Sequence, residues 1–384
     1  MTQDHTAGAT GAAHPTGRPG SARAGNVPAV ERVRTWLIAL VALVVVALAL
    51  RAMTAVVTPI IFAIILGLIV APVRDVVADR VPGWLSWLGH LAAMMAILLV
   101  VAIFVGGIWI SAVQIAQTVP GIVEGMEDAI PDEDAETGVM GDLISMLRQM
   151  ADDFAEDLTA FATGAATGVL GSATQVIFSL ILVFFVTLFI LIEGPRWREK
   201  LGAVTQDATQ DRWIGAVDVV AHKLRLFLLA RFVVGLLTAV LYVLWLWAFG
   251  VDLLLVWAVL ALLFGFIPTI GAIISGALPA IYALLTQDFT TALIIAAGLL
   301  VIEQITGNYI DPKVQGRQIS LSPLIVLLTI VFWGWFWGVA GMLLAVPMTI
   351  VICIICAYIP TLRPVALFLT DRTDLGGLDE VAGT

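Results

Sequence analysis

The sequence has little charge for its length. Of its 384 residues, 12% are charged and 60% are hydrophobic, and the mean hydropathy is +1.03. Soluble domains instead carry roughly a quarter of charged residues. Several apolar runs reach the length of about 20 residues that a helix needs to cross a bilayer, and the short alternating segments of an outer-membrane barrel are absent. The composition therefore predicts an all-α integral membrane protein.

Cysteine and histidine are also scarce. The two cysteines, Cys353 and Cys356, lie in the apolar, helix-like run IVICIICAYI, which lacks the water and the basic neighbour that a reactive thiolate needs. The four histidines have no metal-ligand spacing. We therefore expect no metal site and no cofactor.

Motifs of the common enzyme classes are missing as well. None of the three lysines follows a glycine, which excludes the phosphate-binding sequence G-x-x-x-x-G-K-[ST]. The sequence also contains no G-x-S-x-G elbow and no H-E-x-x-H helix. We expect that the protein is not an enzyme and does not use ATP directly.

The hydrophobic segments divide the chain into a transmembrane region and two polar tails. Residues 1–30 are rich in Gly, Ala, Pro and Ser and predict a disordered tail; residues 31–369 form the transmembrane region; and residues 370–384 are polar. We expect six to eight transmembrane helices. The continuous runs cover residues 35–53, 55–73, 87–117, 169–192, 228–250 and 290–308, and the interrupted runs cover 254–285 and 321–359.

Charge placement predicts the orientation. Residues 119–167 hold twelve acidic residues and one basic residue, whereas residues 193–227 hold the largest basic cluster of the chain. The positive-inside rule places the basic segment and both termini in the cytoplasm and the acidic segment outside. The acidic segment also predicts an amphipathic helix, whose apolar positions are Leu143, Leu147, Met150, Phe154, Leu158 and Phe161.

Glycine and proline interrupt two of the apolar runs. The first reads LLFGFIPTIGAIISG and contains Gly265, Pro268 and Gly271; the second contains Gly338 and Pro347. A pair of interrupted segments indicates the binding site of a transporter, because unwound ends expose backbone dipoles to a solute. The alternative is that the glycines only permit close packing of helices.

Glu303 is an ionisable residue within an apolar run, in GLLVIEQITGNY. Such a residue is a functional candidate, and it could carry a proton or coordinate a cation. In the alternative interpretation Glu303 lies near a helix end, where it is hydrated or pairs with Lys313 or Arg317. We expect Arg225 and Arg231 to extend to the cytoplasmic headgroups.

The C-terminal third resembles the autoinducer-2 exporter family of bacterial inner-membrane proteins. The matching positions are Asn308, Pro312, Gly316, Gly334, Gly338, Gly341, Met342 and Pro347, together with FIPTIG through Phe266, Ile267, Pro268 and Gly271. A departure is Ser322, where many members carry histidine. The likeness covers roughly residues 30–365.

The resemblance implies a multi-span exporter. Some members are described as releasing the quorum-sensing furanone autoinducer-2 and others as exchanging sodium or lithium for protons. It also implies a homo-oligomer, with a pentamer in at least one described case, in the bacterial inner (plasma) membrane.

Our leading hypothesis is export of a small polar solute by alternating access. The first alternative is a sodium(lithium)/proton antiporter, and the second is a non-transporting membrane scaffold. Both interrupted runs could be full spans, or both could be re-entrant hairpins, which positive-inside logic favours. The candidate substrate or ion pathway consists of Gly265, Pro268, Gly271, Glu303, Gln304, Asn308, Asp311, Pro312, Gly338, Gly341 and Pro347.

Overall fold

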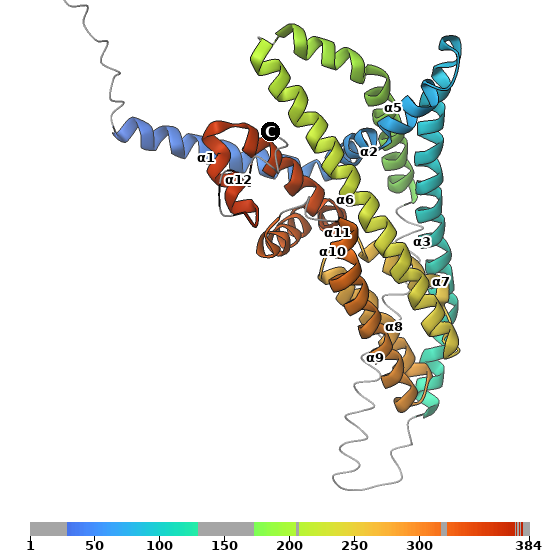
Figure 1. Ribbon diagram of the computed structural model, residues 1–384. Coiled ribbons are helices and arrows are strands. Elements are labelled where there is room, and N and C mark those ends of the chain that lie inside the picture. The colour runs from blue at the N-terminus through green and yellow to red at the C-terminus, as the bar shows by residue number, and fades with distance from the viewer. Residues whose placement is uncertain are drawn as a thin grey trace, which may run out of the picture. The chain divides into compact units, whose positions relative to one another are not determined.

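A computed structural model describes residues 29–129, 173–204, 207–315 and 321–372, together with residues 374, 376 and 378. These residues form helices and no β-strand, which confirms the predicted all-α class (Figure 1). The helices are α1 (Ala29–Ala52), α2 (Thr54–Ala78), η1 (Gly83–Leu85), α3 (Trp87–Ala129), α5 (Ala173–Val204), α6 (Asp207–Ala248), α7 (Leu254–Phe264), α8 (Ile270–Thr286), α9 (Phe289–Ile305), η3 (Thr306–Ile310), α10 (Asp311–Gln315), α11 (Pro323–Tyr358), η5 (Pro360–Leu362) and α12 (Arg363–Leu369).

Two predicted features lie outside the described residues. These are the tail up to residue 28 and the amphipathic helix of residues 143–161. The chain divides into two compact units, Met1–Ala52 and Met53–Thr384. α1 is the described helix of the first unit, and all elements discussed below belong to the second.

Six helices of the described residues are long and apolar enough to cross a membrane. They correspond to α2, α3, α5, α6, α9 continued into α10, and α11. α3 continues to Ala129, well past the predicted end at residue 117. Polar residues can extend a helix beyond the lipid, because helix formation itself does not require hydrophobic side chains.

α2, α3 and α5 pack together, and we call these three helices the frame. Val70 of α2, Met94 of α3 and Leu191 of α5 are buried in their shared apolar cluster. Two of the frame helices contain prolines within regular helix: α2 contains Pro59 and Pro72, and α5 contains Pro195.

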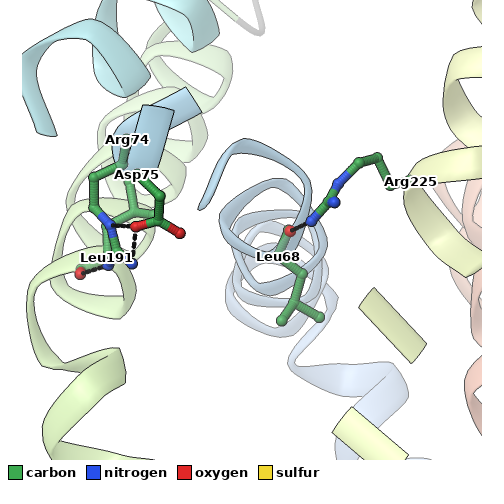
Figure 2. Close-up of polar contacts among 5 residues, drawn as sticks. All are labelled: Leu68, Arg74, Asp75, Leu191 and Arg225. Atoms are coloured by element: carbon green, nitrogen blue, oxygen red, sulfur yellow. Dashed lines mark hydrogen bonds and ion pairs between the residues drawn. The ribbon is translucent and has the colours of Figure 1, made fainter. Parts of the chain in front are cut away.

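Pro72 leaves a backbone carbonyl of α2 without its usual partner. Proline has no N–H, so the carbonyl of Leu68, four residues earlier, cannot accept the regular helical hydrogen bond. The guanidinium of Arg225 on α6 donates to this carbonyl at 3.2 Å (Figure 2). The prediction that Arg225 extends to the headgroups is therefore wrong, because the arginine turns inward to a carbonyl that a proline has left free.

Pro195 has the same effect on α5. It leaves the carbonyl of Leu191 without a helical donor, and Figure 2 shows the guanidinium of Arg74 on α2 donating to that oxygen at 2.7 Å. Arg74 is held in turn by its neighbour Asp75, to which its Nε donates at 2.8 Å. In both joints an arginine from an adjacent helix replaces the missing N–H.

The first interrupted run forms two short helices that meet at a tight turn. α7 has 11 residues and α8 has 17, which correspond to lengths of about 16 and 26 Å, less than the roughly 30 Å of the hydrocarbon core. Thr269 is the central residue of the turn, with φ 64° and ψ −61°, and the N–H of Ile270 donates to the carbonyl of Pro268 at 2.7 Å. This is a γ-turn of the rare, strained kind. A Cβ at Gly271 would collide with the carbonyl of Phe264, so glycine permits the close approach.

The second interrupted run, α11, also folds back on itself. Its backbone leaves the helical conformation at Trp337 and at Gly338, which has φ 63°. On either side of this break, Gly341 lies against the carbonyl of Trp333, and Gly334 lies against Met342. α11 is therefore a helical hairpin whose two limbs touch.

The register of α6 against α9 shows where the first hairpin begins and ends. Trp245 Nε1 donates to the carbonyl of Ile295 at 3.2 Å, and Tyr242 donates to Glu303 at 2.8 Å. Residue numbers fall along α6 as they rise along α9, so the two helices are antiparallel. The end of α6 and the start of α9 are thus at the same end of the pair, and α7 and α8 leave and return there. This geometry matches the re-entrant alternative for residues 254–285.

The α11 hairpin lies at the other end of α6. Tyr358, at the end of its second limb, approaches Gly215 near the start of α6. The N–H of Ser322, just before its first limb, donates to the carbonyl of Leu369, and α12 packs on α11. Both ends of this hairpin therefore meet at the α12 side, opposite the entry of α7 and α8.

The two hairpins contact each other within one buried cluster. Ile267, in the turn between α7 and α8, packs with Ile330 and Ala345 from the two limbs of α11. The interrupted backbone of both runs is thus collected in one region of the molecule.

Candidate functional site: a polar cavity beside the first break

A cavity of about 360 Å³ lies between α6, the α7–α8 turn and the continuation of α9 into α10. Its volume is within the range of about 300–1,000 Å³ that is usual for small-molecule sites. Its walls are contributed by segments far apart in sequence, because α6 and α9 run antiparallel and the hairpin of α7 and α8 lies beside them. Six residues of the predicted pathway line it: Gly265, Pro268, Glu303, Gln304, Asn308 and Asp311.

The other predicted pathway residues lie away from the cavity lining. Gly271 packs behind the turn against Phe264, and Pro312 is exposed on α10. Gly338, Gly341 and Pro347 belong to α11, where they form the hairpin or its buried packing. The structure thus places the first interrupted run and the α9 residues together at the cavity. The second interrupted run packs against the first without lining the cavity.

Two hydroxyl groups hold the carboxylate of Glu303. Tyr242 on α6 donates to Oε1 at 2.8 Å, and Ser275 on α8 donates to the same oxygen at 3.3 Å. Lys313 instead lies over the ring of Tyr309, 3.6 Å from its centroid. The pairing with Lys313 that the alternative interpretation allowed is therefore not formed, and Arg317, the other partner that it allowed, lies outside the described residues. Glu303 joins the hairpin to α6 and α9.

An ion pair lies in the cavity lining at the end remote from Glu303. Arg231 Nη1 of α6 lies 3.2 Å from Asp311 Oδ2 of α10, and the two side chains are only 15% and 14% exposed. The expectation that Arg231 extends to the headgroups is wrong. The sequence contained a signal for this role, because Arg231, Thr238 and Tyr242 recur at helical spacing on one face of α6.

A π-helical turn connects Glu303 to Asp311. In η3 the chain is wound more loosely than in an α-helix, an irregularity that is frequent at functional sites. The hydroxyl of Thr306 donates to the carbonyl of Ile302 at 2.8 Å, and the amide of Asn308 donates to Gln304. The turn sets the direction of the short helix α10, and so of Asp311.

These features define the class of protein as a multi-span helical membrane protein with an internal, charged cavity at a break in its helices. Residues 37–361 match the model of the AI-2E family transporters, so the chain belongs to that family. The match agrees with the extent and the identity that the sequence resemblance predicted.

Several bacterial transport proteins are similar to this chain. A putative transport protein of Haemophilus influenzae is 27% identical over 342 residues, which cover 88% of this chain and 97% of the relative. A putative transport protein of Borreliella burgdorferi is 30% identical over 232 residues, 60% of this chain and 63% of the relative. The AI-2 transport protein TqsA of Escherichia coli is 30% identical over 207 residues, 53% of this chain and 59% of the relative. The last two matches thus cover less than two thirds of the relatives' length.

Proposed function

We propose that this membrane transporter exports a small polar solute by alternating access, through the cavity between α6 and α9 and without direct use of ATP. The supporting observation is the cavity itself, whose lining combines interrupted backbone at Gly265 and Pro268 with the charged groups of Glu303 and Asp311. Unwound backbone at a binding site offers amide and carbonyl dipoles to a polar solute. Autoinducer-2 is one candidate solute, given the name of the E. coli relative.

The proposal extends to the cellular setting. The basic segment of residues 193–227, at the end of α5 and the start of α6, favours a bacterial inner-membrane location with both termini in the cytoplasm, and the family resemblance favours a homo-oligomer. Both points rest on charge distribution and family likeness.

A comparison of retained metabolites tests solute export. Cells lacking the protein should accumulate the solute, and the wild-type gene should restore its release. Ala272→Trp fills the cavity, since Ala272 is part of its lining, and should abolish release. Ala277→Trp adds the same bulk at an exposed position of the same helix, outside the cavity lining, and should leave release intact. If the two variants behave alike, or if no metabolite is retained, the proposal fails.

The antiporter is a second candidate because Glu303, a carboxylate with two hydroxyl donors, lies in the cavity lining. In this version Glu303 exchanges a proton for sodium or lithium. Vesicles with the wild-type protein should then show pH-dependent sodium flux that Glu303→Gln abolishes. Absence of sodium flux in the wild type contradicts the antiporter and leaves solute export standing.

A further inference from the structure

We infer that the ion pair between Arg231 and Asp311 is a gate that closes one end of the transport cavity, and that movement of α10 opens it. The inference rests on the proposed function, since it concerns access to the same cavity. It concerns a residue, Arg231, that the pattern of interrupted runs did not indicate.

The position of the pair makes it the boundary of the cavity. Along α6 the lining begins at Arg231 and continues to Thr238, and along α9 and its continuation it runs from Glu303 to Asp311. Because the two helices are antiparallel, Arg231 and Asp311 are the terminal lining residues on both walls, nearest the start of α6. About 12 Å of helix separates Asp311 from Glu303. The pair therefore stands at the end remote from the Glu303 cluster.

The contacts of Arg231 suit a joint that opens. Its Nη1 lies 3.2 Å from Asp311, its guanidinium lies over the ring of Phe227 at 5.6 Å from the centroid, and its buried Nε has no hydrogen-bond partner among the described residues. By contrast, Arg74 of the frame binds both Leu191 and Asp75, through three hydrogen bonds. A guanidinium that forms several hydrogen bonds with fixed geometry holds its helix in place. The contact of Arg231 with α10 is the ion pair with Asp311.

The partner element is short and joined through loosely wound backbone. α10 has five residues, follows the π-helical η3 and begins at Asp311. Irregular helix turns of this kind provide hinges, where a few backbone angles absorb a motion. Separation of the pair would leave the guanidinium of Arg231 poorly hydrated, so the closed state persists until water or a polar solute enters and hydrates it.

Cysteine accessibility tests the gate without knowledge of the solute. Ala272 of the cavity lining is replaced by Cys in a protein whose Cys353 and Cys356 are replaced by Ala. A membrane-impermeant methanethiosulfonate is applied to inside-out vesicles and, separately, to intact cells. With the ion pair intact, labelling should be slow. Asp311→Asn should accelerate it from one face only, by about tenfold or more, because a minor open state is typically populated at about 0.1–10%.

The exchange of the two charges distinguishes a gate from a general structural role. Arg231→Asp alone should accelerate labelling as Asp311→Asn does, and the double variant Arg231→Asp/Asp311→Arg should return it to the slow rate. Size-exclusion elution of each variant checks that it folds. Arg231→Lys, which keeps the charge, should label nearly as slowly as the parent protein and provides a second test if the exchanged variant does not fold.

Arg225→Gln is the matched control, since it removes a half-buried arginine of the same helix that lies outside the cavity lining. It should leave labelling slow. Acceleration by this variant, equal labelling in all variants, or failure of both the exchanged and the Lys variant to restore the slow rate would each overturn the gate. Equal, ready labelling in all variants would overturn the gate and leave solute export standing, because metabolite release is measured separately.

Discussion

The frame and the cavity region interrupt their helices with similar residues, yet the backbone responds differently. In the frame, Pro72 and Pro195 lie inside continuous helices, and Arg225 and Arg74 bind the carbonyls that the prolines leave free. Around the cavity the helix ends at the turn of residues 265–269 and at Trp337, and the chain folds back. Proline alone therefore does not break these helices.

The difference lies in glycine and in neighbouring donors. Both breaks combine a residue of positive φ with a glycine at a point of close backbone approach, Gly271 in the first and Gly341 in the second. Pro72 and Pro195 have no residue of positive φ nearby, and each has an arginine within reach. In a membrane an unsatisfied carbonyl is expensive, so a proline is tolerated in straight helix where an adjacent side chain can donate.

The largest expected effect is on the α11 hairpin. Gly341→Ala places a Cβ against the carbonyl of Trp333, which is backbone and cannot move aside. We expect a loss of about 3 kcal/mol or more in the free energy of unfolding, measured by thermal unfolding in detergent. The control is Gly106→Ala in α3, where a Cβ meets no atom within 4 Å; this change should be neutral or stabilising by up to about 1 kcal/mol. Equal stability of the two variants would contradict the hairpin contact.

A double-mutant cycle tests the arginine joints. Arg74→Leu leaves the carbonyl of Leu191 without its donor and should cost about 2 kcal/mol of folding free energy, since a buried unsatisfied polar group costs about 1–3. Pro195→Ala supplies a backbone N–H to the same carbonyl. In the Pro195→Ala background, Arg74→Leu should therefore cost about 1 kcal/mol less. If the two costs simply add, Arg74 does not act by replacing the lost N–H, and its bonds to Asp75 account for its effect.

Much of this contrast was visible in the sequence. Hydropathy located the spans, and glycine with proline located both breaks, because these signals act within one segment. The frame joints were missed because Arg225 and Leu68 are separated by 157 positions, and no local pattern pairs them. The same limit applies to the partners of Glu303. Its partners come from α6 and α8 rather than from the following turn, which only the antiparallel register of α6 and α9 determines.

The hydroxyl donors of Glu303 should differ in importance. Tyr242→Phe removes the 2.8 Å hydrogen bond and should cost about 1.5 kcal/mol of folding free energy, the lower end for a bond to a charged group. Ser275→Ala removes the longer bond of 3.3 Å, and Ser275 also donates to the carbonyl of Ala272; it should cost about 0.5 kcal/mol. Thermal unfolding compares them. A larger loss for Ser275→Ala would show that the hairpin side, rather than α6, holds the carboxylate.

A further expected effect concerns Thr269, whose φ of 64° is unfavourable for a β-branched residue. Thr269→Gly relieves this strain and should stabilise the folded protein by about 1 kcal/mol, because strained backbone costs about 1–3 kcal/mol and glycine adds entropy to the unfolded chain. Thr269 also lines the cavity, so strain retained there is expected to serve transport, and the variant should export solute more slowly. Thr286→Gly, in regular helix at the end of α8, should destabilise instead. If Thr269→Gly instead destabilises the protein, the turn at Thr269 is not strained. The first interrupted run would then differ from the frame only in the positions where its helices end.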